Sequence, residues 1–149
     1  MKTLIIYDSL YGNTEQIARA IGAAVTGDVK VVKAAEANPD EIGTFDLLIF
    51  GSPTQGGRYS KPMQEFFDVI PAGALKDKRV AAFDTRYKTK LVKLFGYAAA
   101  RLADYLKAKG ANLIAPAEAF FVKGQKGPLA DDELERAAAW AKSIAEARK

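Results

Sequence analysis

The sequence predicts an α/β protein built on a doubly wound parallel sheet whose two faces are covered by helices. Short apolar runs alternate with helical patterns along the 149 residues, without a repeat or a linker. The runs at 3–7 and 47–50 are apolar at almost every position, which is typical of parallel strands buried on both faces. We therefore expect a single domain over residues 1–149, with right-handed crossovers between the strands.

The first half of the chain predicts three strands, a long helix and a short one. The strand at 3–7 leads into a helix with a clear apolar stripe. The strand at 29–32 is shorter and more polar, so we expect it at an edge of the sheet. Gly43 interrupts the pattern that begins at Asn38, which leaves room for only a short helix before the strand at 47–50. The stripe of the long helix consists of Ile17, Ala20, Ile21 and Ala24.

The second half predicts three helices around two more strands. Pro62 fits the first turn of a helix. A strand at 79–83 and a long helix over 91–106 follow, and then a last strand region broken at Pro116. Asp131 begins an acidic stretch that favours a helix start. The apolar stripes are Met63, Phe66, Phe67 and Ile70, then Leu91, Leu94, Phe95, Ala98, Leu102 and Leu106, and finally Leu134, Ala137, Ala141 and Ile144 beside Trp140.

The composition excludes several kinds of chemistry. The chain has no cysteine and no histidine, which removes disulfides, thiolate nucleophiles, Ser-His-Asp hydrolysis and zinc sites of the Cys/His type. Redox chemistry would therefore need an organic cofactor. No apolar run approaches the roughly 20 residues of a membrane span. The first apolar run is also too short for a secretory signal, so we expect a cytoplasmic protein.

The positive charge is concentrated in one part of the sequence. The net charge is +4, yet the stretch from 76 to 93 holds seven basic residues against only Asp77 and Asp84. Such a cluster favours an acidic protein, an anionic small molecule or nucleic acid as a partner. The alternative is an ordinary solvated face. The seven residues are Lys76, Lys78, Arg79, Arg86, Lys88, Lys90 and Lys93.

The stretch Ser9–Thr14 joins the first strand to the first helix and contains no lysine or arginine. A helix N-terminus offers free N–H groups and a partial positive charge, so it can bind a phosphate without a cationic side chain. Gly12 permits a close approach of the backbone, and Ser9, Asn13 and Thr14 can donate hydrogen bonds. The alternative is that Asn13 or Thr14 only caps the helix.

The loop after the third strand, residues 51–62, is long for a connection from a strand to a helix. Pro53 stiffens its start, and Gly56 and Gly57 let the backbone approach a flat ligand or turn a peptide group. Tyr59 could stack on a ring. The alternative is a surface turn with an incidental tyrosine.

The loop after the fourth strand is expected at 84–90. Thr85 offers a hydroxyl, Tyr87 a ring and Arg86 a positive charge. We expect Asp84 to serve the turn or a helix N-terminus. The alternative is a capped helix start whose basic groups face water. Because the carboxyl ends of parallel strands meet at one edge of the sheet, the three loops together offer a phosphate-binding site and two segments that could flank a planar ring.

At these loops the chain resembles the flavodoxin family, and the resemblance extends over essentially all 149 residues. YDSLYGNTEQIA is similar to the family's phosphate loop, GSPTQGG to its first flavin loop and FDTRYK to its second. The resemblance implies a five-stranded sheet in the order 2-1-3-4-5. The last strand lacks the insertion of the long-chain members, so the chain resembles the short-chain kind.

The resemblance also implies noncovalent FMN. The phosphate would lie at the first loop and the isoalloxazine between the other two, with Tyr87 as the outer aromatic side chain. Gly56 or Gly57 would carry the peptide that turns when the flavin is reduced. Neither a metal site nor a catalytic residue is implied. The implied cofactor-binding residues are Ser9, Leu10, Tyr11, Gly12, Asn13, Thr14, Pro53, Thr54, Gln55, Gly56, Gly57, Thr85, Arg86, Tyr87 and Lys88.

The charge around the expected flavin differs from that of the family, whose members are usually acidic there. Arg86, Lys88 and Arg58 stand at the two flavin loops. A partly solvated positive charge near 4 Å stabilises a reduced anionic flavin by on the order of 1 kcal/mol. We therefore predict a less negative potential for the last one-electron reduction than in acidic relatives. We also expect redox partner proteins with an acidic docking face, no nucleic-acid partner, and a monomer.

Three functions fit the sequence. The first is a diffusible electron carrier with bound FMN. The absence of histidine favours it, because apart from Asp84 and the tyrosines no proton-handling group stands out in the loops. The second is an FMN-dependent oxidoreductase acting on a quinone or a porphyrinogen. The third is a flavin-free scaffold that keeps the fold for protein contacts, since a fold does not fix a function.

Overall fold

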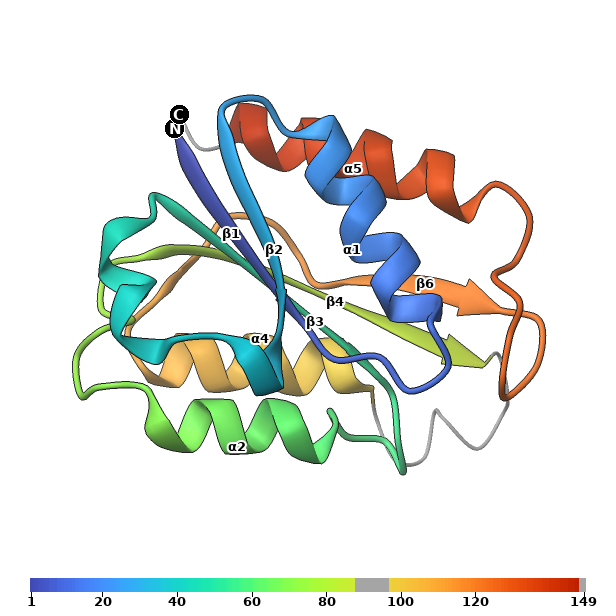
Figure 1. Ribbon diagram of the computed structural model, residues 1–149, viewed down its shortest axis with the longest axis horizontal. Helices are drawn as coiled ribbons and strands as arrows, with labels where there is room; N and C mark the ends of the chain where they lie inside the picture. Colours follow the sequence, from blue (N-terminus) through green and yellow to red (C-terminus); the bar gives the residue numbers. More distant parts are fainter. Residues whose placement is uncertain (88–96, 148–149) are drawn as a thin grey trace.

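The computed structural model describes residues 1–87 and 97–147, and its strands form one parallel sheet (Figure 1). The strand order is β2-β1-β3-β4-β5, which confirms the predicted topology, and β6 also pairs with β4. The edge position expected for the polar second strand is confirmed as well. The strands are β1 (Lys2–Tyr7), β2 (Asp28–Lys33), β3 (Leu47–Pro53), β4 (Arg79–Tyr87), β5 (Asn112–Leu113) and β6 (Glu118–Val122).

Helices cover both faces of this sheet, as Figure 1 shows. The helices α1 (Asn13–Ala24) and α5 (Glu133–Ala147) lie on one face, and α2 (Lys61–Val69) and α4 (Ala98–Ala108) lie on the other. Two short 3₁₀ segments, η1 (Ala34–Glu36) and η2 (Pro39–Thr44), follow β2. No helix in the described ranges combines the length and the apolar character that crossing a bilayer requires.

Alternate residues of the central strands build two apolar cores. Leu4 and Ile6 of β1 belong to the core under α2 and α4, whereas Ile5 and Tyr7 belong to the core under α1 and α5. This alternation follows from the pleat of a strand. Because β1 is buried on both faces, its carboxyl end is held rigidly where the first predicted loop begins.

The fourth strand is longer than the sequence indicated. The prediction placed its end at Phe83 and a loop at 84–90, but β4 continues to Tyr87. The extension is stabilised by pairing with β6, from Phe83 opposite Glu118 to Tyr87 opposite Val122. The first half of the expected third loop is therefore part of the sheet.

The last strand region is split as predicted. Both β5 and β6 pair with β4, so together they form one interrupted fifth strand. The interruption contains Pro116, which cannot donate to a ladder. The earlier part of the helix predicted over 91–106 lies outside the described residues up to Gly96, and its remainder is α4.

One core residue of the last helix was predicted wrongly. Leu134 is 43% exposed, although Ala137, Ala141 and Ile144 are buried as expected. The inward position of the first turn is occupied by Glu133, which lies four residues before Ala137 on the same helix face. Burial of its carboxylate is tolerated because the carboxylate accepts hydrogen bonds from the Phe121 N–H and from Arg136.

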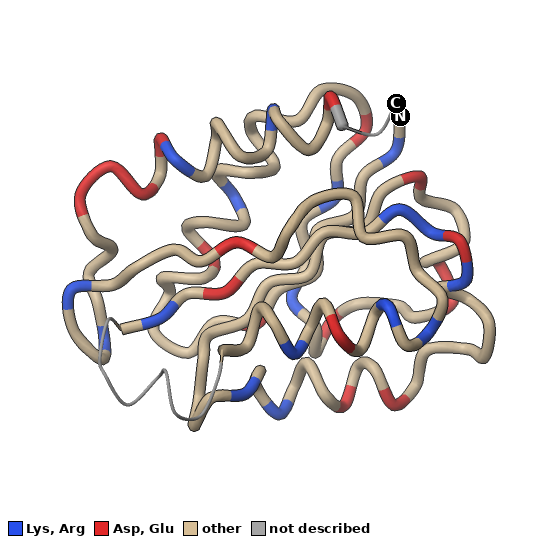
Figure 2. Tube along the Cα trace, turned by 180° about the vertical axis from the view of Figure 1, so that it is seen from behind, with Lys and Arg blue, Asp and Glu red and all other residues tan. Residues whose placement is uncertain are grey.

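The basic cluster of the sequence does not form a single patch among the described residues. The residues from Lys76 to Arg79 lie at the amino end of β4, whereas Arg86 lies near its carboxyl end. Seven residues of strand place these ends roughly 20 Å apart. Figure 2 accordingly shows basic positions at both ends of the sheet.

Candidate functional site

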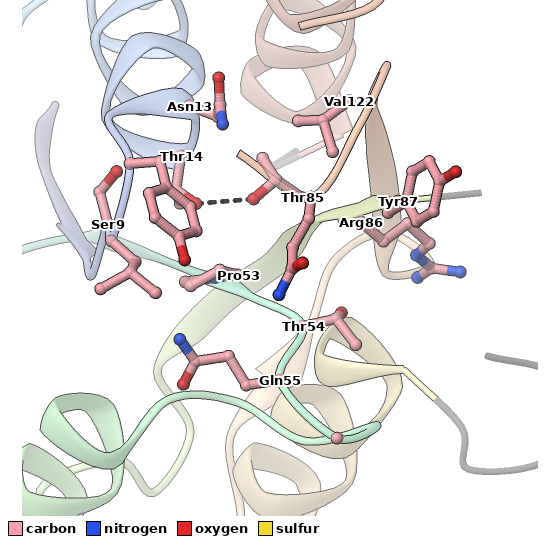
Figure 3. Close-up of a pocket in the computed structure, with 14 residues that line it drawn as sticks. Ser9, Asn13, Thr14, Pro53, Thr54, Gln55, Thr85, Arg86, Tyr87 and Val122 are labelled. Atoms are coloured by element: carbon pink, nitrogen blue, oxygen red, sulfur yellow. Dashed lines mark hydrogen bonds between the residues drawn. The ribbon is translucent and has the colours of Figure 1, made fainter. Parts of the chain in front are cut away.

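A cavity of about 320 Å³ opens at the carboxyl ends of β1, β3 and β4 (Figure 3). Its volume is typical of a small-molecule site. It brings together the three loops that the sequence singled out. The predicted residues that line it are Ser9, Leu10, Tyr11, Asn13, Thr14, Pro53, Thr54, Gln55, Gly56, Thr85, Arg86 and Tyr87.

Two of the predicted residues do not line the cavity, and a third falls outside the described structure. Gly12 precedes α1 as its N-cap residue. Gly57 is buried in the turn of the second loop. Lys88 lies outside the described residues.

The first loop leaves the start of α1 without a side-chain cap. Gly12 has a φ of 92°, in the left-handed region that glycine adopts without strain. Its N–H donates to Ser9 Oγ at 3.0 Å, which closes the loop on itself. Neither Asn13 nor Thr14 caps the helix, so the capping alternative is wrong. A bound anion at this end could therefore accept hydrogen bonds from the first backbone N–H groups of α1.

A buried hydrogen bond joins the first loop to β4. The hydroxyls of Thr14 and Thr85 lie 2.7 Å apart (Figure 3). Thr14 is 1% and Thr85 5% exposed, so water does not compete for this bond. The bond fixes the spacing between the start of α1 and the carboxyl end of β4, which form adjacent walls of the cavity.

The second loop contains a tight turn. Gln55 and Arg58 exchange two backbone hydrogen bonds, at 2.8 and 3.0 Å. Gly56 and Gly57, between them, have φ values of 57° and 78°, and a two-residue turn with both φ values positive favours glycine. The Gly57 carbonyl accepts a hydrogen bond from Arg101 Nε at 2.9 Å. The turn is therefore anchored at Gly57.

Tyr59 does not line the cavity. Its ring packs edge to face on Phe67 of α2, with 5.3 Å between the centroids, and its hydroxyl donates to Gln64 Oε1 at 3.0 Å. The idea that Tyr59 stacks on a ligand ring is therefore wrong. The aromatic and apolar side chains left at the rim are Leu10, Tyr11 and Tyr87, which are 60%, 45% and 47% exposed.

Asp84 is fully buried and connects three segments around the cavity. Its Oδ2 accepts hydrogen bonds from the Ala99 N–H of α4 at 2.9 Å and from the Thr54 hydroxyl at 3.2 Å. Arg86 donates to both carboxylate oxygens. The expectation that Asp84 serves a helix N-terminus is thus confirmed. Burial raises the pKa of Asp84, while the hydrogen bonds from Arg86 and Ala99 oppose that shift.

Arg86 is the one charged side chain among the described residues that line the cavity. Its guanidinium carbon lies 3.4 Å from the centroid of the Tyr97 ring. Its side chain is only 13% exposed. The positive charge is therefore held between a carboxylate and an aromatic face and does not project freely into the cavity.

Two lining residues were not predicted. Val122 ends β6, and Gln125 lies in the loop that follows. The rule that ligands bind beyond the carboxyl ends of parallel strands could have indicated this loop. The interrupted strand concealed the signal, because the β6 segment reaches the cavity edge only through its pairing with the extended β4.

The donor set suits a ligand with a phosphate and a planar ring. No carboxylate lines the cavity within the described residues, so nothing there repels an anion. The uncapped start of α1 and the hydroxyl of Ser9 supply neutral donors. The exposed surfaces of Leu10, Tyr11 and Tyr87 offer apolar contact for a ring.

Comparison with known proteins agrees with this geometry. The Flavodoxin family model matches residues 5–140, and the chain belongs to the flavodoxin family. An uncharacterised protein of Methanocaldococcus jannaschii is 30% identical over 97% of this chain and 98% of its own. Among solved structures, a flavodoxin from the domain Archaea superposes with a TM-score of 0.83 at 25% identity, covering 99% of both chains.

A second structural match is oxidised flavodoxin 2 of Bacillus cereus, with a TM-score of 0.82 and 25% identity over 98% of this chain and 99% of that one. The cofactor of the family is FMN, and its general role is electron transfer. The predicted family, fold and cofactor are therefore confirmed.

Proposed function

We propose that this protein is a carrier that passes single electrons between partner proteins through FMN held in the cavity. The observation that carries the proposal is a cavity whose described lining holds no histidine, lysine or carboxylate and whose one charged side chain is Arg86. The chain has no histidine, and the carboxylate of Asp84, next to the lining residue Thr85, is buried and bonded to Arg86, Ala99 and Thr54. A carrier needs its protein only to bind, orient and partly expose the flavin.

The residues divide between the two ends of the cofactor. The N–H groups at the start of α1, with Ser9 and Thr14, would hold the phosphate through neutral donors. The segments 53–57 and 85–88 would flank the isoalloxazine, with Tyr87 against its outer face. FMN, when bound there, supplies one-electron chemistry.

The second loop favours Gly56 over Gly57 as the residue whose peptide group turns toward the flavin. Arg101 already holds the Gly57 carbonyl. Gly56 has no contact within 4 Å at the position of a Cβ, so its surroundings leave room for movement. Its positive φ of 57° is also the conformation that glycine tolerates best.

The partner would be a redox protein with an acidic docking face, and not nucleic acid. Arg58 and Lys126 are exposed and belong to the same loops as the lining residues Gly56 and Gln125. The exposed Leu10 and Tyr87 offer apolar contact at the cavity. A basic rim around an apolar centre attracts an acidic partner and leaves the encounter short-lived. A monomeric, cytoplasmic, single-domain carrier completes the proposal.

The experiment compares the carrier with an FMN-dependent oxidoreductase acting on a quinone or porphyrinogen. Holoprotein is mixed anaerobically with NADPH in a stopped-flow instrument, with and without a quinone. We expect the flavin to stay oxidised with NADPH alone and to be reduced once an unrelated flavoprotein reductase is added. Rapid bleaching by NADPH, followed by reoxidation on adding the quinone, would instead establish the enzyme.

A further inference from the structure

A fourth loop, residues 123–130, follows β6 and was not among the predicted parts of the site. It closes on itself because the Lys123 N–H donates to the Pro128 carbonyl and the Ala130 N–H to the Phe121 carbonyl, both at 2.8 Å. Gln125 of this loop lines the cavity. The loop therefore has a defined shape and adds a wall beside the three predicted ones.

The fourth loop is hydrogen-bonded through Asn13 to the first loop, Ser9–Thr14, which is called the phosphate loop below. Asn13 Nδ2 donates to the Lys126 carbonyl at 3.2 Å, and Asn13 is 8% exposed. Gly127 faces the same amide, since a Cβ at this position would lie 2.6 Å from Asn13 Oδ1. The amide that the sequence suggested as a donor to phosphate thus contacts the fourth loop in this structure.

The same contact brings a cation to the phosphate loop. Lys126 Nζ lies 5.9 Å from the centroid of the Tyr11 ring. Tyr11 and Asn13 flank Gly12, the N-cap residue of α1, so Lys126 contacts the loop on both sides of this residue. Within the described residues Lys126 forms no ion pair, whereas Lys123 of the same loop is paired with Asp131 at 3.1 Å.

We propose that the fourth loop extends the FMN site through Gln125 and Lys126, and that Lys126 supplies the positive charge that the phosphate loop lacks. The inference rests on the proposed function, because the anion is the phosphate monoester of FMN. Lys126 is exposed, so water weakens its attraction for the phosphate, which is therefore modest. The unpaired ammonium would favour the doubly charged phosphate over an uncharged ligand end.

The test is binding of FMN and riboflavin, which differ by the phosphate, to the apoprotein at low salt. Quenching of flavin fluorescence reports both dissociation constants. Lys126→Gln should weaken FMN binding about threefold to fivefold, the upper part of the range for an exposed ion pair, and leave riboflavin binding unchanged. Lys123→Gln is the matched control, and both flavins should bind it as they bind the wild type, because Asp131 already neutralises Lys123.

An unchanged affinity of Lys126→Gln for FMN would overturn the proposal, as would an equal weakening of FMN and riboflavin. Tight FMN binding by the wild type together with either result would leave the proposed function intact. Wild-type protein that binds no FMN would overturn both. The difference in FMN affinity between the wild type and Lys126→Gln should also decrease as the salt concentration rises, since salt screens exposed charges.

Two glycine variants test the contact between the fourth loop and Asn13. Gly127→Ala forces a Cβ against Asn13, and does so at a residue whose φ is 104°. The variant should bind both FMN and riboflavin several-fold more weakly, because the phosphate loop is displaced. Gly124→Ala meets its nearest atom at 3.5 Å, an ordinary contact, and should leave both affinities unchanged. Equal affinities in the two variants would show that the fastening to Asn13 does not matter.

Discussion

The carboxylate of Asp84 accepts two hydrogen bonds from Arg86, at 2.9 and 2.6 Å, although only one residue separates them in β4. This pairing changes the expectation of a strongly positive flavin environment. A guanidinium bound to a carboxylate presents little net charge to a neighbouring ligand. The predicted rise in potential should therefore depend less on Arg86 than the sequence suggested.

Removing the negative charge of Asp84 should expose this balance. Asp84→Asn leaves the Arg86 guanidinium without a counter-ion beside the cavity. The last one-electron potential of bound FMN should become less negative by roughly 40 mV, equivalent to about 1 kcal/mol. The free energy of unfolding should fall by roughly 3 kcal/mol, as for other broken buried pairs.

Potentiometric and urea titrations measure the two effects of Asp84→Asn. Asp104→Asn is the control, because it removes the same charge from an exposed position of α4 and should change neither quantity. An unchanged potential in Asp84→Asn would show that the Arg86 charge does not reach the flavin.

The hydroxyl pair of Thr14 and Thr85 should be energetically coupled. Thr14→Val and Thr85→Val each leave the other buried hydroxyl without its partner, so each should cost about 1–2 kcal/mol of unfolding free energy. The double variant should cost about 1 kcal/mol less than the sum, because no orphan hydroxyl remains. A double-mutant cycle by urea denaturation measures the coupling, and strictly additive effects would contradict the bond.

Gly51 of β3 should not tolerate a side chain. A Cβ there would lie 2.0 Å from the Phe83 ring, so Gly51→Ala should lower the unfolding free energy by about 3 kcal/mol through overpacking. Gly43→Ala is the matched control, since no atom lies within 4 Å of its added Cβ. Thermal denaturation of the two variants gives the comparison, and equal melting temperatures would refute the predicted clash.

Glu133 should make stability sensitive to acid. Hydrogen bonds from Arg136 and from the Phe121 N–H lower its pKa below the ordinary 4.5, against the opposing effect of burial. A lowered pKa stabilises the fold above the ordinary value, and this stabilisation is lost as the pH falls through the lowered one. Glu133→Gln should therefore cost about 2 kcal/mol at neutral pH.

The difference in unfolding free energy between the wild type and Glu133→Gln should shrink steadily once the pH falls below 4.5. Urea denaturation over a pH series measures it. Glu135→Gln, at an exposed position two residues on, should show little difference at any pH. A Glu133 difference that does not change with pH would contradict the assignment.

The sequence was sufficient for the parts of the site that local patterns encode. The apolar run into Ser9 and the helical stripe beginning at Ile17 place the phosphate loop at a strand end. It was insufficient where distant pairing decides the structure. The pairing of Tyr87 with Val122 extends β4 and brings the fourth loop to the cavity, and no local pattern around either residue indicates it.

Side-chain direction was the other limit. Tyr59 and Arg86 were both placed near the flavin from their positions in the loops. Tyr59 turns into the core to pack on Phe67, while Arg86 turns toward Asp84. Tyr59 lies away from the cavity, whereas Arg86 lines it with its charge already paired, and either partner becomes evident only when the layers are packed.

The central claim is that the chain binds FMN and uses it one electron at a time. An anaerobic potentiometric titration of the purified holoprotein, followed by its visible spectrum, tests this claim most directly. The account predicts one flavin per chain and two separate one-electron steps. Protein that retains no flavin, or a flavin that takes up both electrons in a single step, would contradict it.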